Sequence, residues 1–269
     1  MTIPYADGLS RFGRLCFALA LVAFGVAHFI VGDFVAGRAP AYPAGMPGGT
    51  AWAFLSGAAF LVAGMAVFAH RQAVRALFVV SLLIVVWAVL RQIPLAAADH
   101  MLGGAWTMLG KGVALAGGAL GIAASILWAS PEGSDSAARD RRAATLGLVG
   151  RCSLGAFLVL AGIQHFLFPQ FVMTLVPAWI PGPLFWTYFA GVSLIAGGVG
   201  LALPPTARLA AVFVGGMIFT WLLVLHIPRA LAASGPGAAT NEWTAVIEAL
   251  AFSAVAFALV ARPRRVMRS

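Results

Sequence analysis

Long apolar runs alternate with short polar segments along the whole chain. A helix that spans the hydrocarbon core of a bilayer needs about 20 mostly apolar residues. Eight runs have this character, at residues 13–32, 51–69, 75–93, 106–129, 147–167, 184–203, 207–226 and 243–261. They lack the strict apolar–polar alternation that is typical of strands. We therefore predict an all-α polytopic membrane protein with eight transmembrane helices, because helices satisfy backbone polar groups within each span.

The composition supports this prediction. Of the 269 residues, 62% are hydrophobic and 9% are charged, and the mean hydropathy is +0.97. A soluble domain has about 25% charged residues, so lipid must be the solvent for most of this chain. The net charge of +9 does not point to nucleic acid, because the charged residues lie in short loops and tails between apolar runs.

Basic residues are unevenly divided between the two sets of loops that alternate along the predicted spans. One set holds Arg11, Arg14, Arg71, Arg75, Arg139, Arg141, Arg142, Arg151, Arg208, Arg262, Arg264, Arg265 and Arg268. The other set holds Arg38, Arg91 and Arg229, with Lys111 just inside a span. Since Lys and Arg gather on the cytoplasmic side, we expect a bacterial-type inner (plasma) membrane protein with both termini in the cytoplasm. The first apolar run is expected to be a working helix rather than a cleaved signal, since the fifth run matches it.

The second half of the chain repeats the first. Gly25 and His28 match Gly162 and His165 at one common spacing. Further matched pairs are Phe34 and Phe171, Trp52 and Trp186, Trp87 and Trp221, Pro94 and Pro228, and Trp106 and Trp243. Changes of spacing fall between spans, which is typical of duplicated helical units. The sequence therefore predicts two tandem parallel four-helix bundles at residues 1–130 and 146–269, the second with a basic C-terminal tail. Residues 131–145 are predicted to be a charged cytoplasmic linker.

Four segments of the second half carry a family resemblance: residues 162–166 (GIQHF), 177–181 (PAWIP), 185–191 (FWTYFAG) and 242–244 (EWT). With them the chain resembles the DoxX-like membrane protein family, once per half and more weakly in the first half. The resemblance implies a four-helix membrane fold in each repeat. Some members are associated with quinone-linked oxidation of sulfur compounds or with oxidative stress, and the family offers no agreed catalytic set to transfer.

His28 and His165 are the first candidates for chemistry, since ionisable residues inside spans are costly and often functional. Each has a glycine three residues earlier, which leaves room on the same helical face for a flat ring. Imidazole suits proton exchange with a quinone near neutral pH. The alternative is a histidine that hydrogen-bonds across helices and stabilises packing. A bis-histidine haem between them is the less favoured possibility, so the cofactor prediction is a quinone rather than haem.

Lys111 and Glu248 occupy equivalent repeat positions with opposite charge. They are predicted either to bind a ligand and relay protons, or to form a structural pair; snorkelling of Lys111 is a further alternative. Gln92 and His226 are also equivalents, each two residues before a proline, and are predicted to line an outward-facing pocket with the two histidines. A solvated rim is the alternative. The candidate ligand-binding residues are His28, His165, His226, Gln92, Lys111, Glu248, Gln164, Trp106 and Trp243.

Two proline-rich loops, at residues 40–47 and 177–183, each carry an aromatic residue, Tyr42 or Trp179. Each loop is predicted to be a lid over a pocket or an interfacial anchor. The five histidines and the two cysteines, Cys16 and Cys152, show no metal-ligand spacing, and the cysteines are interpreted as small core residues. Two functions remain: a quinone-linked redox protein or subunit with a redox partner protein, or a non-catalytic membrane module that binds lipid or supports a complex.

Overall fold

The computed structural model describes residues 5–36, 42, 47–130 and 136–261, and every regular element in these residues is helical. The first repeat contains α1 (Ala6–Val31), α2 (Gly49–Phe68), α3 (Ala73–Trp87), η2 (Ala88–Gln92), α4 (Ile93–Ala98) and α5 (Gly104–Ala129). The second contains α6 (Ser136–Leu167), α7 (Pro169–Met173), α8 (Pro183–Ala202), α9 (Ala207–Trp221), η3 (Leu222–His226), α10 (Ile227–Ala232) and α11 (Pro236–Ala258).

Seven helices in the described residues are long and apolar enough to cross a membrane, by length and composition. They are Ala6–Val31, Gly49–Phe68, Ala73–Ala98, Gly104–Ala129, Ala137–Leu167, Pro183–Ala202 and Ala207–Ala232. They coincide with the first seven predicted spans and make the chain a multi-pass membrane protein. The eighth predicted span overlaps α11, which carries Glu242 and Glu248 and is not among the seven. An eighth crossing therefore stays a prediction.

The same irregularity interrupts the third helix of each repeat. The π turns η2 and η3 each follow a tryptophan and end two residues before a proline, Pro94 or Pro228. A proline cannot donate a backbone hydrogen bond, and its ring clashes with the carbonyl four residues earlier. The wider π turn accommodates both effects and lets the helix continue. Such turns are frequent at functional sites, and they place Gln92 and His226 at equivalent positions.

The two repeats interlock rather than standing as separate bundles. The main neighbour of α1 is α2, followed by α11 of the other repeat; α6 packs mainly on α5 and α8. Equivalent glycines permit this approach, since a Cβ on Gly13 would lie 2.5 Å from the Ala254 carbonyl oxygen, and one on Gly150 would lie 2.7 Å from the Gly121 Cα. Small residues allow such close packing in lipid. The prediction of two separate tandem bundles is thus corrected. The last helix of each repeat packs on both repeats: α5 contacts α3 and α6, and α11 contacts α9 and α1.

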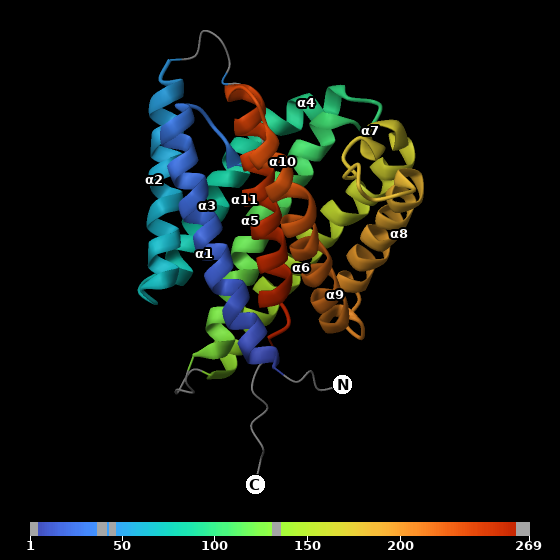
Figure 1. Ribbon diagram of the computed structural model, residues 1–269. Helices are drawn as coiled ribbons and strands as arrows, with labels where there is room; N and C mark the ends of the chain where they lie inside the picture. Colours follow the sequence, from blue (N-terminus) through green and yellow to red (C-terminus); the bar gives the residue numbers. More distant parts are fainter. Residues whose placement is uncertain (1–4, 37–41, 43–46, 131–135, 262–269) are drawn as a thin grey trace.

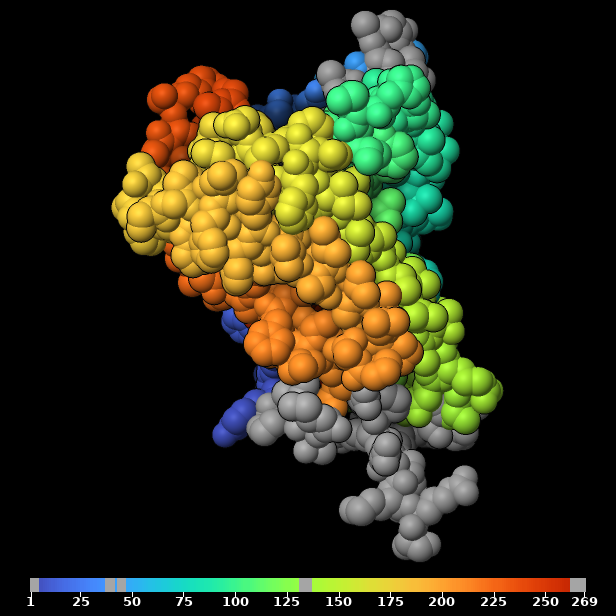
Figure 2. Space-filling view, turned by 90° about the vertical axis from the view of Figure 1, so that its right-hand side faces the viewer, coloured from blue at the N-terminus to red at the C-terminus, as the bar shows by residue number. Residues whose placement is uncertain are grey.

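Most of the long helices run between the lower and the upper end of the molecule in Figure 1, tilted against one another. The start of α1 and the end of α11 lie at one end of the molecule, and the equivalent short helices α4 and α10 lie at the other end with α7 (Figure 1). The two repeats therefore have the same orientation. In Figure 2 the right-hand side of Figure 1 faces the viewer, and α8 and α9 form much of that surface.

Several predicted features need correction or lie outside the described residues. Residues 136–145, predicted as linker, form the first turns of α6, because Ala and Arg are strong helix formers. Both cysteines are free, and Cys152 is exposed rather than in the core. Outside the described residues lie Arg38, residues 40–41 and 43–46 of the first proline-rich loop, residues 131–135 of the predicted linker, and the basic tail at 262–269.

Candidate functional site

The two equivalent histidines hold their rings in the same way. The Nδ1 atom of His28 lies 2.7 Å from the Phe24 carbonyl oxygen, and the Nδ1 atom of His165 lies 2.7 Å from the Ala161 carbonyl oxygen. A carbonyl oxygen only accepts, so Nδ1 must carry the hydrogen in both rings. In the neutral ring the remaining nitrogen, Nε2, is therefore a hydrogen-bond acceptor.

His28 is bonded at both ring nitrogens. Its Nε2 accepts a hydrogen bond from the Val35 N–H at 3.3 Å, and its ring stacks on Phe60 with a centroid distance of 5.4 Å. Only 1% of the residue is exposed. The cavity beside it has a volume of about 30 Å³, which holds no more than a water molecule. The structure thus favours the packing interpretation of His28 over ligand binding.

His165 faces a larger space. The Val172 N–H, equivalent to that of Val35, bonds instead to the Phe168 carbonyl oxygen at the start of α7. Among the described residues no group hydrogen-bonds to the Nε2 of His165. The ring lines a cavity of about 180 Å³ between α7, α8 and α9. The other lining residues are Val172, Leu175, Val176, Pro177, Ile180, Trp186, Thr187, Phe189, Ala190, Met217, Trp221, Val224 and Leu225.

Thr187 adds a second polar group to this cavity. It is 1% exposed, and its hydroxyl has no hydrogen-bond partner among the described residues. A buried hydroxyl without a partner costs about 1–3 kcal/mol, so this group points to a ligand or water in the cavity. The residue was not among the sequence candidates. The repeat gave no signal for it, since Thr187 follows the matched Trp186 where Ala53 follows Trp52.

The second proline-rich loop covers this cavity. Pro177 and Ile180 line it, and the Trp186 Nε1–H donates to the Pro181 carbonyl oxygen at 3.1 Å, which ties the loop to α8. Trp179 is 71% exposed and does not line the cavity. Pro177 and Ile180 of the loop thus line the pocket, and its tryptophan faces outward; a role as interfacial anchor stays a prediction.

Lys111 and Glu248 form an ion pair between α5 and α11. The Lys111 Nζ lies 2.5 Å from the Glu248 Oε2, and the two side chains are 13% and 3% exposed. Neither residue lines the cavity beside His165. The structural pairing that the sequence left open is therefore observed. It joins the last helices of the two repeats, because α11 and α5 are in contact.

Gln164 and Trp106 are bonded within the protein. The Gln164 Nε2 donates to the carbonyl oxygens of Leu102 at 2.6 Å and Gly103 at 3.0 Å, and its Oε1 accepts from Thr107 at 2.9 Å. The Trp106 Nε1–H donates to the Asp99 carbonyl oxygen at 2.8 Å. Gln164 thus holds α6 against the start of α5. Gln164 serves packing between the repeats and Trp106 serves packing within the first repeat, although the sequence suggested ligand binding for both.

The predicted pocket shared by all the polar candidates is not formed. Gln92 is buried and lines the small cavity with His28, and its Oε1 has no bonded partner among the described residues. His226 ends η3, which packs on α11, and it does not line the cavity beside His165. Trp243 is 45% exposed on α11. Since His28 and His165 line separate cavities, the arrangement offers no shared haem site. The described residues also contain no group of three or more His, Cys, Asp or Glu that would hold a metal ion.

Comparison with known proteins adds one match. A family model described as "Domain of unknown function (DUF8561)" matches residues 154–265, which cover most of the second repeat and less than half of the chain. No curated protein and no solved structure matches the chain. The resemblance to the DoxX-like family therefore stays a prediction. The match includes α8, α9 and His165, so the larger cavity lies mainly within it.

Proposed function

We propose that this membrane protein binds a small ring-bearing amphiphile of the quinone type in the cavity beside His165. The observation that carries the proposal is the buried Thr187 hydroxyl, which has no partner among the described residues and lines the same cavity as the His165 ring. A dry apolar cavity of about 150 Å³ holds benzene. The volume of about 180 Å³ therefore suits one substituted six-membered ring.

The two polar groups complement both states of such a ring. The Thr187 hydroxyl donates to a quinone carbonyl oxygen, and the neutral His165 Nε2 accepts from a quinol hydroxyl. Protonated His165 donates to the carbonyl instead. The rest of the wall is apolar and includes Trp186, Phe189 and Trp221, whose flat faces pack against an aromatic ring. In this proposal the chain holds and orients the ring, while a redox partner protein exchanges electrons with it.

The second candidate function is a non-catalytic module that binds membrane lipid. It is favoured by the apolar lining of the cavity and by an adjoining apolar groove between α8 and α9. It makes a different demand on the polar groups, because a hydrocarbon chain needs neither a hydrogen-bond donor nor an acceptor. The contribution of Thr187 and His165 therefore separates the two functions.

The test is native mass spectrometry of the detergent-purified protein, with organic extraction of whatever co-purifies. We expect a bound quinone-type molecule in the wild type, and a drop of roughly tenfold in its occupancy in Thr187→Val and in His165→Ala, because a lost hydrogen bond contributes about 1 kcal/mol or more. His100→Ala is the matched control, since His100 is exposed and lines neither histidine cavity. Phospholipid alone, retained equally by all four proteins, would contradict the proposal and favour the lipid module.

The proposal also covers how the chain crosses the membrane. We place α11 as an eighth crossing that α1, α5 and α9 surround, because a helix with two glutamates is tolerated in a membrane where protein rather than lipid encloses it. Both termini then face the cytoplasm of a bacterial-type inner membrane, as the distribution of arginines predicts.

A further inference from the structure

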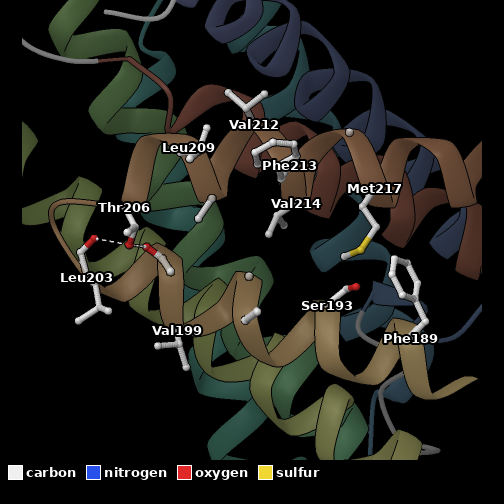
Figure 3. A pocket seen from close by; sticks show the side chains of 15 residues that line it. Phe189, Ser193, Val199, Leu203, Thr206, Leu209, Val212, Phe213, Val214 and Met217 are labelled. Carbon is white, nitrogen blue, oxygen red and sulfur yellow. Dashed lines mark hydrogen bonds between the residues drawn. The ribbon is translucent and has the colours of Figure 1, made fainter. Parts of the chain in front are cut away.

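An apolar groove runs between α8 and α9 on the outside of the second repeat. Its volume is about 900 Å³, and Figure 3 shows its walls, with Val214 and Met217 on α9 opposite Ser193 on α8. The groove lies on the side of the molecule that Figure 2 brings forward. In a membrane this face meets lipid.

Glycines open the groove, and the first repeat has larger residues at the equivalent positions. Gly216 lines it, and a Cβ added there would meet no heavy atom within 4 Å. The equivalent residue of the first repeat is Leu82, by the spacing that relates Trp87 to Trp221. Gly197 and Gly200 also line the groove, and their equivalents are Ala63 and Ala66. The groove is thus a feature of the second repeat, which also holds the larger cavity.

The groove adjoins the cavity beside His165. Phe189 and Met217 line both spaces, and Figure 3 shows them next to each other at one end of the groove. Leu203 and Thr206 stand at the other end (Figure 3). The Thr206 hydroxyl donates to the carbonyl oxygens of Gly200 and Leu203, so its donor is used within the protein. A helix rises about 1.5 Å per residue, so the distance along α8 from Phe189 to Leu203 is roughly 20 Å.

We infer that the ligand is a long-tailed membrane amphiphile, whose ring occupies the cavity and whose single apolar tail lies in the α8–α9 groove. The inference rests on the proposed function, since it takes the cavity as the seat of the ring. The polar end of the ligand is fixed at Thr187 and His165, and the tail passes between Phe189 and Met217. A groove of roughly 20 Å exceeds half of a hydrocarbon core about 30 Å thick. The ligand therefore reaches its site sideways from the bilayer, between α8 and α9, and not from the aqueous phase.

The test compares two probes on two proteins. The probes are a tail-less 2,3-dimethoxy-5-methyl-1,4-benzoquinone and its 6-decyl derivative, and their binding to wild type and Gly216→Leu is measured in lipid nanodiscs. Gly216→Leu introduces the side chain that the first repeat has, at a helical position with free space. We expect it to weaken binding of the decyl probe roughly tenfold, the scale of an overfilled contact surface, and to leave the tail-less probe unchanged. Gly237→Leu is the control, since a Cβ there also meets no atom and Gly237 lies outside the groove.

A photoreactive group at the end of the decyl tail gives a second readout. We expect mass spectrometry to map its cross-links to groove residues such as Val199, Val212 and Phe213. Equal weakening of both probes in Gly216→Leu, or no weakening of either, would overturn the tail site while leaving the ring site standing. Cross-links confined to other helices would also overturn it. Failure of both probes to bind the wild type would instead contradict the proposed function itself.

Discussion

The two copies of one helical unit treat the same position differently. Beside His28 the space is filled, because Phe60 stacks on the ring and Phe34 turns inward and is 8% exposed. Beside His165 the equivalent of Phe60 is Leu194, and Phe171, the equivalent of Phe34, is 66% exposed. As a result, the cavity beside His28 has a volume of about 30 Å³ and the cavity beside His165 has one of about 180 Å³.

Under the proposed function, duplication separates stability from binding. A single copy must both pack and hold a ligand, and a cavity weakens packing because its lining atoms lack neighbours. In this chain the first copy has both ring nitrogens of His28 bonded to backbone. The second copy leaves His165 Nε2 and the Thr187 hydroxyl facing open space. The tightly packed repeat thus supports the one that keeps a site.

The largest expected effect on stability concerns Lys111 and Glu248, the equivalent positions at which the two copies carry opposite charges. Glu248→Ala removes the carboxylate that pairs with the Lys111 ammonium between the repeats, which should lower the free energy of unfolding by about 3–5 kcal/mol. Unfolding in detergent followed by circular dichroism measures it. The matched control on the same helix is Glu242→Ala, which breaks the more exposed pair with Arg229 and should cost at most about 1 kcal/mol. Similar losses in both variants would show that the Lys111–Glu248 pair has no special role in joining the copies.

The next effect distinguishes the two histidines. His28→Ala removes two hydrogen bonds and a stacked ring from a filled site, so we expect a loss of about 2–4 kcal/mol of stability with binding of the tail-less benzoquinone unchanged. His165→Ala should show the reverse, weaker binding with a loss of about 1 kcal/mol. Thermal unfolding and probe titration on the same preparations measure both. Loss of binding in His28→Ala without loss of stability would contradict the claim that His28 serves packing and His165 serves binding.

The smallest effect comes from giving the first copy a residue of the second. Phe60→Leu enlarges the space beside His28 and should cost about 1–2 kcal/mol of stability through lost packing. It should create no second quinone site, because the His28 Nε2 remains bonded to the Val35 N–H. Native mass spectrometry with the tail-less probe counts the ligands per chain. A second bound molecule would show that volume alone, rather than the unoccupied polar groups, defines the site.

Much of the fold could be predicted from the sequence. Apolar runs located seven of the membrane-crossing helices, and the repeat identified His28 with His165, which share their Nδ1 geometry. The exchange of packing partners between repeats could not be predicted, since helices of similar composition in lipid pair through local shape, such as that at Gly13 and Gly150.

The candidate site was predicted only in part. His165 came from the repeat pattern, but polarity alone did not separate it from His28, because the difference lies in which backbone N–H reaches Nε2. Lys111 and Glu248 attracted attention as intramembrane charges, and they bond to each other. Thr187 escaped notice because a single hydroxyl in an aromatic stretch has no motif. It gains meaning only when the structure shows it buried without a partner.

The most direct measurement is an electron cryomicroscopy map of the protein in lipid nanodiscs with the decyl benzoquinone bound. We predict density for the ring between α7, α8 and α9, with one oxygen within hydrogen-bonding distance of the Thr187 hydroxyl and, at a pH where His165 is protonated, another within hydrogen-bonding distance of its Nε2–H. A ring bound elsewhere, or a cavity beside His165 that protein side chains fill as they do beside His28, would contradict the account.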